Sequence, residues 1–300
     1  MSAIANVVES EIVPRLLAAH EARQREANAP PPLLEAPLAP RSAVPADTGV
    51  LGEDFVAAFA DELIGAARGA IEARIDRLAS GGMSAEDICL HALAPTARHL
   101  GDLWERDLCS FIDVTAGTAT LHGIMNALRP AFANRPSAMS RTRTAMLVTA
   151  PGEQHRFGLS MLAEFFRKEG WQVALPLATT IAQITAQVAA RPVDVLGFSA
   201  GSERVLGALA ACIAAVRASA YNPDVVVMVG GPIFLARPEF VAAVGADGTA
   251  GDAPEAVRRA FALLKARRAA LTRRLARPTA RSTSSPAKAA ACDRGPSHAP

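Results

Sequence analysis

The sequence predicts an α/β protein in which a four-helix cap bundle precedes a Rossmann-like (flavodoxin-like) parallel β-sheet. Two observations lead to this prediction. Apolar residues recur at helical spacing over residues 53–128, whereas short apolar runs alternate with helical segments after residue 143. The runs are continuously apolar and do not alternate with polar residues, which is typical of a parallel sheet that helices cover on both faces.

Changes in composition divide the 300 residues into four parts. We expect an N-terminal helix and a Pro-rich linker over 1–50, and the cap bundle over 51–136. The parallel-sheet domain is expected over 137–266, and a basic disordered tail over 267–300.

In the cap, one apolar stripe predicts a helix from Glu53 that Gly81-Gly82 ends. Ser84 suits the N-cap of a second helix, with Asp87 three residues further on. The other expected cap helices span 85–100, 102–105 and 111–128. In the following domain, strands are expected over 144–149, 171–175, 193–198 and 225–229, and residues 243–245 are a candidate start of a short fifth strand. The helices between and after them are expected over 157–168, 180–190, 204–218 and 252–264, with a continuation of the last into the basic segment as the alternative.

The formal charge of +2 is unevenly distributed along the chain. Residues 265–300 carry nine Lys or Arg and one acid, which leaves 22 basic and 28 acidic residues before them. An acidic body binds a phosphate backbone poorly, so we expect DNA contact only indirectly, or weakly through the basic tail. No apolar run is long enough to cross a bilayer, and Met1–Arg15 lacks the pattern of a leader. We therefore expect no membrane partner and a cytoplasmic location.

The segment after the first expected strand reads E-x-H-x-x-G, with Glu153, His155 and Gly158. A histidine directly after a buried strand is placed to meet a ligand, and an acid two residues earlier can hydrogen-bond its other ring nitrogen. Gly158 permits close approach of the backbone. A histidine at a helix N-terminus with a capping glutamate is the alternative interpretation.

Small residues follow the next two strands at separations of about one strand–helix–strand repeat. Forty residues separate Gly158 from Ser199, and 28 separate Gly201 from Gly230. The pair Gly230-Gly231 and the segment around Ser199 would leave a slot that runs down into the sheet. A long or tail-bearing ligand needs such a slot, whereas close packing of the glycines is the alternative.

These three elements resemble the signature of the cobalamin-binding domain: D-x-H-x-x-G, then S-x-L, then G-G. The resemblance covers residues 51–265, because the helical bundle is similar to the cap of that family. It implies His155 as the lower axial ligand of cobalt, Glu153 as its orienting partner and Gly158 as the loop glycine. It also implies a pocket for the nucleotide tail of the cofactor, lined and floored by Ser199, Gly201, Gly230 and Gly231.

Two positions depart from the family pattern, since Glu153 replaces an aspartate and Gly201 replaces a leucine. In the cap, L-G-x-x-W at 100–104 resembles the family motif whose tryptophan lies over the upper face of the corrin. Trp104 is therefore a candidate cofactor contact, with a place in the bundle core as the alternative. The Glu-His pair of adenosylcobalamin photoreceptors is absent, because the matching residues are Val114-Thr115.

The chain is most similar to the AerR/PpaA antirepressor group of purple photosynthetic bacteria, notably in GEQHRFGLSMLAEFFRKEGW at 152–171. This resemblance implies a cobalamin-binding (hydroxo- or adenosylcobalamin), light-responsive photoreceptor and transcriptional antirepressor of photosynthesis genes. Its expected partner is a CrtJ/PpsR-type repressor. A haem-binding redox sensor, like the related domain of AppA, and a corrinoid carrier for a methyltransferase are the alternatives. We expect no enzyme activity, because no activated nucleophile, metal triad or phosphate loop is present in the sequence.

Overall fold

The computed structural model describes residues 51–65, 68–132, 143–219, 222 and 224–276. The helix and linker expected over 1–50 lie outside the described residues, as does the tail from 277 onward. All the described residues belong to one compact unit.

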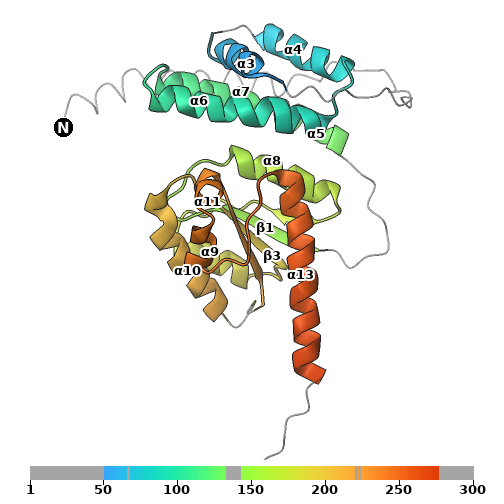
Figure 1. Cartoon of the computed structure of the whole chain (residues 1–300), viewed down its shortest axis with the longest axis vertical. Coiled ribbons are helices and arrows are strands. Elements are labelled where there is room, and N and C mark those ends of the chain that lie inside the picture. The colour runs from blue at the N-terminus through green and yellow to red at the C-terminus, as the bar shows by residue number, and fades with distance from the viewer. Residues whose placement is uncertain (1–50, 66–67, 133–142, 220–221, 223, 277–300) are drawn as a thin grey trace, which may run out of the picture. The chain divides into compact units, whose positions relative to one another are not determined.

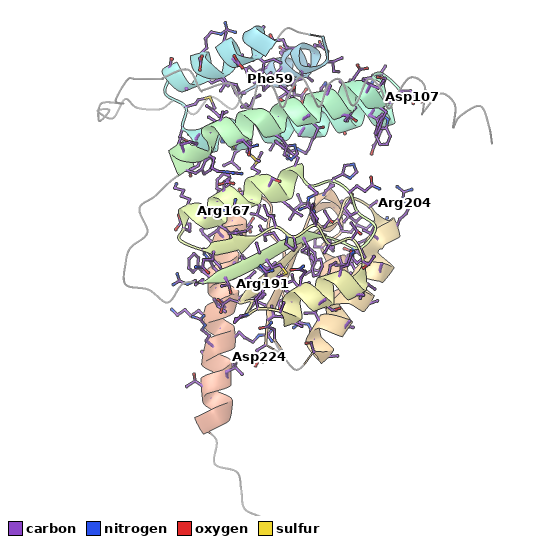
Figure 2. All side chains as sticks on the ribbon, turned by 180° about the vertical axis from the view of Figure 1, so that it is seen from behind. Phe59, Asp107, Arg167, Arg191, Arg204 and Asp224 are labelled. Atoms are coloured by element: carbon purple, nitrogen blue, oxygen red, sulfur yellow. The ribbon has the colours of Figure 1, made fainter. Side chains whose placement is uncertain are left out.

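The first half of the described chain is helical, as predicted. Phe59 is fully buried among the helices of this cap, and Figure 2 places it there. The helical segments of the cap are α3 Glu53–Gly65, α4 Arg68–Ser80, α5 Ala85–Asp87, the π-helix η2 Ile88–Leu93, α6 Ala94–Glu105, α7 Phe111–Leu128 and the 3₁₀-helix η3 Arg129–Phe132.

The cap differs from the prediction in two places. The single helix expected from Glu53 is divided into α3 and α4, in a stretch that contains the poor helix formers Gly65 and Gly69. The helices expected over 85–100 and 102–105 instead form one continuous helical run through α5, η2 and α6. Pro95 accounts for the π-helix inside this run, because its missing N–H cannot extend an α-helical ladder. The predicted N-cap Ser84 is confirmed, and in the structure Asp87 completes a capping box with it.

The second half contains a four-stranded parallel sheet in the order β2-β1-β3-β4. All four predicted strands are confirmed with small shifts at their ends: β1 Thr144–Thr149, β2 Gln172–Ala174, β3 Val195–Ser199 and β4 Val226–Gly230. The candidate start of a fifth strand at 243–245 is wrong, because these residues end a helix. Only an isolated parallel bridge between Met228 and Gly248 extends the sheet on this side within the described residues.

Helices cover both faces of the sheet, as Figure 1 shows. Successive strand residues point to opposite faces, so Ala145 and Val195 pack with α8 and α13, whereas Met146 and Leu196 pack with α9 and α10. The helices of this domain are α8 Phe157–Lys168, α9 Ile181–Ala189, the 3₁₀-helix η4 Glu203–Val205, α10 Leu206–Ala218, α11 Pro232–Ala236, α12 Glu239–Ala243 and α13 Ala253–Ala276.

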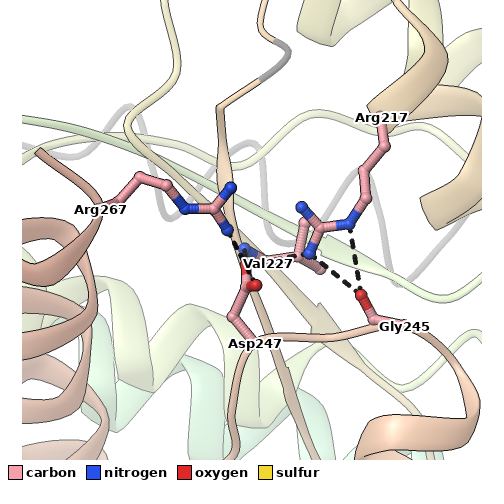
Figure 3. A network of polar contacts seen from close by, with 5 residues as sticks. All are labelled: Arg217, Val227, Gly245, Asp247 and Arg267. Carbon is pink, nitrogen blue, oxygen red and sulfur yellow. Dashed lines mark hydrogen bonds and ion pairs between the residues drawn. The ribbon is translucent and has the colours of Figure 1, made fainter. Parts of the chain in front are cut away.

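The closing helix α13 continues into the basic segment, which was the alternative, and takes in residues 267–276 of the expected tail. Its arginines explain the extension. Arg267 donates to Asp247 at 2.9 Å, and Arg268 donates to Asp194 at 3.0 Å, so both side chains hold the helix against the sheet domain. Figure 3 shows the first of these contacts. None of the described helices is both long and apolar enough to cross a membrane.

Candidate functional site

The carboxyl ends of three strands are level with one another. Thr149 at the end of β1 pairs with Ser199 at the end of β3, which pairs with Gly230 at the end of β4. The chain leaves β1 toward β2 on one side and continues to β3 on the other, so the topological switch point lies between β1 and β3. Ligands of such sheets bind in the crevice outside the strand ends at this point. The loops that follow these three residues therefore border the candidate site.

The loop after β1 presents the imidazole of His155 to solvent. Its side chain is 84% exposed, whereas that of Glu153 is 8% exposed. The predicted hydrogen bond between the two is present, since Nδ1 of His155 lies 2.6 Å from Oε1 of Glu153. A carboxylate only accepts hydrogen bonds, so this contact places the ring proton on Nδ1 and leaves the lone pair on Nε2. The exposed ring therefore has a nitrogen suited to a metal.

Glu153 is held by more than the histidine ring. Oε1 also accepts from the backbone N–H of Gln154 at 2.8 Å and of His155 at 3.1 Å, and Oε2 accepts from the N–H of Gly201 at 2.8 Å. Burial opposes the charge of this carboxylate, but the backbone N–H donors and the ring outweigh it and lower the pKa of Glu153 below its usual value. At neutral pH, Glu153 is thus a fixed anion behind the ring.

The glycines predicted to line a slot have different surroundings. A Cβ added to Gly230 would meet nothing within 4 Å, so open space lies in front of the end of β4. A Cβ on Gly201 would lie 3.0 Å from Oε2 of Glu153, and one on Gly231, at φ 115°, would lie 2.1 Å from the carbonyl oxygen of Ala200. Of these three residues, Gly230 alone opens onto free space. The other two are in close contact with protein atoms.

The other predicted site residues lie at accessible positions. Ser199 is half-buried at the end of β3. Gly158 is exposed in the first turn of α8, with open space where a Cβ would stand. Trp104 near the end of α6 is 46% exposed, so its alternative placement in the bundle core is wrong. It is close in sequence to three more large apolar residues that are each more than half exposed: Leu108, Phe111 and Ile112. Asp107, with φ 55°, forms the turn between them (Figure 2).

Sequence reasoning missed three residues at the same edge of the sheet. Arg156 donates to the carbonyl oxygens of Leu175 and Pro176 at 3.3–3.4 Å and so fixes the loop after β2. Leu177 in that loop and Leu235 in α11 are strongly exposed. The exposure of an apolar residue in a loop cannot be recognised from the sequence. The position of Arg156 directly after His155, in contrast, is a sequence signal for a role at this edge.

The chain matches known protein families over both halves. The sequence pattern of the B12 binding domain matches residues 143–260, and that of a second B12 binding domain matches residues 57–129. These matches cover the sheet domain and most of the cap. The protein belongs to the cobalamin-binding family.

Two individual proteins show the extent of the similarity. An uncharacterized 20.5 kDa protein in the bchF-crtJ intergenic region of Rhodobacter capsulatus is 26% identical over 178 residues, which are 59% of this chain and 92% of that protein. The monomethylamine corrinoid protein of Methanosarcina barkeri has the same fold, with a TM-score of 0.59 and 17% identity over 73% of this chain and 100% of that protein. The Rossmann-like architecture and the helical cap are thus confirmed.

Cobalamin is therefore the cofactor of this domain, and the residues at the edge of the sheet fit it. The free Nε2 of an exposed imidazole suits the cobalt ion, and the open space at Gly230 suits an appended nucleotide. Leu177 and Leu235 offer exposed apolar surface of the kind that a corrin ring requires, and Trp104 of the cap is exposed as well.

Proposed function

We propose that this protein is a cobalamin-binding, light-responsive regulator that acts as a transcriptional antirepressor by binding a CrtJ/PpsR-type repressor of photosynthesis genes. The single observation that supports it most is the oriented, exposed imidazole of His155, with Nδ1 tied to Glu153 at 2.6 Å. Cobalamin, when bound, supplies visible-light absorption and a cobalt–ligand bond that light can break. The protein's own residues supply the rest.

His155 would hold the cobalt of cobalamin through Nε2. Its hydrogen bond to Glu153 fixes the tautomer, orients the ring and raises the basicity of the ligating nitrogen. Because Glu153 is buried and held by three backbone N–H groups, it cannot turn away from the ring without losing several hydrogen bonds. Removal of such a supporting partner typically weakens metal binding by about 10- to 100-fold.

Ser199 and Gly230 are the proposed contacts of the nucleotide tail. They are adjacent in register at the ends of β3 and β4, and the space in front of Gly230 is free of protein atoms to 4 Å. A side chain at position 230 would project into that space. Gly201 and Gly231 lie in the same two loops, and each is in close contact with a neighbouring loop.

The cap is proposed to carry the response. Trp104, Leu108, Phe111 and Ile112 leave an unusual amount of apolar surface exposed around one turn of the bundle, which favours contact with a cofactor or a partner. Trp104 would contact the bound cofactor. For light to switch such a surface, the bound cofactor would have to favour one state of the cap over the other by several kcal/mol.

The name of a relative and the residues of the site both favour regulation over catalysis. The relative from Rhodobacter capsulatus lies, by its name, in the bchF-crtJ intergenic region, which supports a connection with a crtJ product. The residues at the sheet edge hold and orient a cofactor, and we assign none of them a catalytic task. We therefore propose that the protein binds and signals without being an enzyme.

Reconstitution with a tetrapyrrole tests the site. The wild-type protein, His155→Ala and the control His91→Ala, an exposed cap histidine, are each incubated with hydroxocobalamin, adenosylcobalamin and haem, in the dark and after illumination. We expect the wild type and His91→Ala to retain cobalamin through gel filtration. His155→Ala should lose the spectrum of imidazole-ligated cobalt and bind at least tenfold more weakly. Equal spectra and affinities for all three proteins would contradict the axial assignment. If the protein retained haem, as shown by a Soret band, but not cobalamin, the haem sensor would be favoured.

Interaction measurements test the regulatory role. The protein with bound cobalamin is titrated against a purified CrtJ/PpsR-type repressor in the dark and in the light, and the repressor's binding to operator DNA is followed. We expect illumination to change the affinity for the repressor at least tenfold and to release it from DNA. Two results together would indicate a corrinoid carrier. The protein would not bind the repressor in either state, and a methyltransferase would transfer a methyl group from the bound corrinoid to an acceptor.

A further inference from the structure

Glu153 connects two loops that are far apart in the sequence. Its Oε1 faces the ring of His155 at 2.6 Å, and its Oε2 accepts from the backbone N–H of Gly201 at 2.8 Å. Gly201 follows β3, whereas Glu153 follows β1. One carboxylate therefore spans from the exposed imidazole to the neighbouring loop, and each of its oxygens has its own donors.

The missing side chain at position 201 makes this bridge possible. A Cβ built on Gly201 would lie 3.0 Å from Oε2 of Glu153, which is closer than an ordinary van der Waals contact. A larger side chain would extend further into the same region and push the carboxylate away. The space that Gly201 leaves empty is thus filled by the end of the glutamate side chain.

The loop that carries Gly201 has little freedom to move aside. The N–H of Ala200 donates to the carbonyl oxygen of Gly230 at 3.0 Å. The carbonyl of Ala200 in turn approaches Gly231 so closely that a Cβ there would lie 2.1 Å from its oxygen. These contacts with the end of β4 hold the backbone next to Gly201 in place. A side chain at position 201 would therefore displace the carboxylate of Glu153 and not the loop.

We propose that Gly201 is a positioning residue for His155, and that Glu153 and Gly201 form a matched pair. The glutamate is long enough to reach the N–H of Gly201, and the glycine leaves room for it. Through this pair the loop after β3 sets the direction and the tautomer of the imidazole. The inference rests on the proposed function, in which His155 is the axial ligand of cobalamin.

The pair predicts a rescue between two substitutions. An aspartate at position 153 is one methylene shorter and withdraws the carboxylate from position 201, which makes room for a side chain there. We therefore compare Gly201→Leu, Gly201→Ala, Glu153→Asp and the double variant Glu153→Asp/Gly201→Leu. Gly207→Leu is the matched control, because Gly207 is exposed in α10 with open space around it.

Two measurements are made on each variant. The tautomer of His155 in the cofactor-free protein is read from ¹⁵N chemical shifts at a single neutral pH, and the affinity and absorption spectrum are recorded with hydroxocobalamin. In the wild type and Gly207→Leu we expect the proton on Nδ1. Gly201→Leu should show a mixture of tautomers and about tenfold weaker cobalamin binding, as expected for a lost supporting contact. The double variant should bind more tightly than Gly201→Leu, so that the two changes are not additive.

The outcomes separate this inference from the proposed function. An unchanged tautomer and affinity in Gly201→Leu, or additive losses in the double variant, would overturn the matched pair. If Gly201→Leu does not fold by circular dichroism, the same two readouts in Gly201→Ala decide. If His155→Ala binds cobalamin as the wild type does, the axial role fails, while the tautomer in the cofactor-free variants still shows whether Gly201 positions the ring.

Discussion

Arg267 of α13 donates a hydrogen bond to Asp247 at 2.9 Å and so ties the long C-terminal helix to the segment that follows α12. The other carboxylate oxygen of Asp247 accepts from Arg217 at 3.0 Å and from the backbone N–H of Val227 at 2.7 Å (Figure 3). One side chain therefore joins α10, α13 and strand β4. Asp247 lies beside β4, the outer strand of the sheet, where the described residues form only an isolated bridge and no fifth strand.

Asp247→Ala should lower the free energy of unfolding by about 2 kcal/mol, because the buried N–H of Val227 loses its acceptor and two arginines lose a partner. The loss would appear as a lower urea midpoint in circular dichroism with an unchanged slope. Asp76→Ala, at an exposed position on α4, is the control and should leave the midpoint nearly unchanged. An equal effect of both substitutions would show that Asp247 does not stabilise the fold.

The contact of the cap with α8 depends on a buried carboxylate. Glu164 accepts from Arg129 at 3.0 Å and from Arg167 at 2.6 Å, and its side chain is almost fully buried. Because both arginines are partly exposed, we expect Glu164→Gln to cost only about 1 kcal/mol. Hydrogen exchange should nevertheless become faster in η3 and at the end of α7. Glu203→Gln, which alters an exposed pair with Arg237, is the control. Unchanged exchange in η3 would exclude this role of Glu164.

The cap also contains an acid-sensitive ion pair. Arg74 of α4 donates from Nε to Glu62 of α3 at 2.7 Å and forms a second bond to the other oxygen. The hydrogen bond from Arg74 lowers the pKa of Glu62 despite some opposing burial. A pKa lowered in the folded state stabilises the protein above the usual glutamate pKa of about 4.3, and this stabilisation is lost as the pH falls through the lowered value.

Glu62→Gln should therefore be less stable than the wild type by about 0.5–1 kcal/mol at pH 7, a value reduced by solvent screening. The difference should shrink as the pH falls below about 4. Urea unfolding of both proteins at a series of pH values measures it, with Asp76→Asn as the control. A difference that stays constant down to the acid limit would mean that the lost contact is not ionic.

Much of the fold follows from local sequence patterns. The four strands are predicted because each is a short, continuously apolar run, and the helices between them because of their periodicity. Residues 243–245 are misleading, since Val244 is buried like a strand residue although it caps the end of α12. The sequence leaves the end of α13 open, because its arginines pair with Asp194 and Asp247, and these contacts join residues far apart in the sequence.

The candidate site is predictable only in part. Glu153 and His155 are two residues apart, so their hydrogen bond follows from the motif. The third member of this arrangement, Gly201, is 48 residues away from Glu153, and its N–H could be located only in the folded chain. The sequence also does not decide whether Trp104 is buried or exposed, because an aromatic residue at helical spacing suits the core and the surface equally.

The cysteines offer a last test, which concerns the cap surface around Trp104. Cys89 and Cys212 are fully buried, and burial raises the pKa of their thiols to about 12 and about 11. Cys109 is half-buried in the turn after α6, where partial burial and the charge of Asp113 raise its pKa less. Since the thiolate is the reactive form, iodoacetamide should modify Cys109 first, and faster as the pH rises.

Bound cobalamin should slow this reaction several-fold if the turn that carries Cys109 covers the cofactor. Peptide mass spectrometry assigns the modified residue, in a protein in which Cys292, outside the described residues, is replaced by serine. Unfolding in guanidinium should make all three remaining cysteines react and serves as the control. Modification of Cys89 ahead of Cys109 would contradict the packing of the cap. An unchanged rate at Cys109 with cobalamin bound would place this turn away from the cofactor, because a covered thiolate is shielded from the reagent.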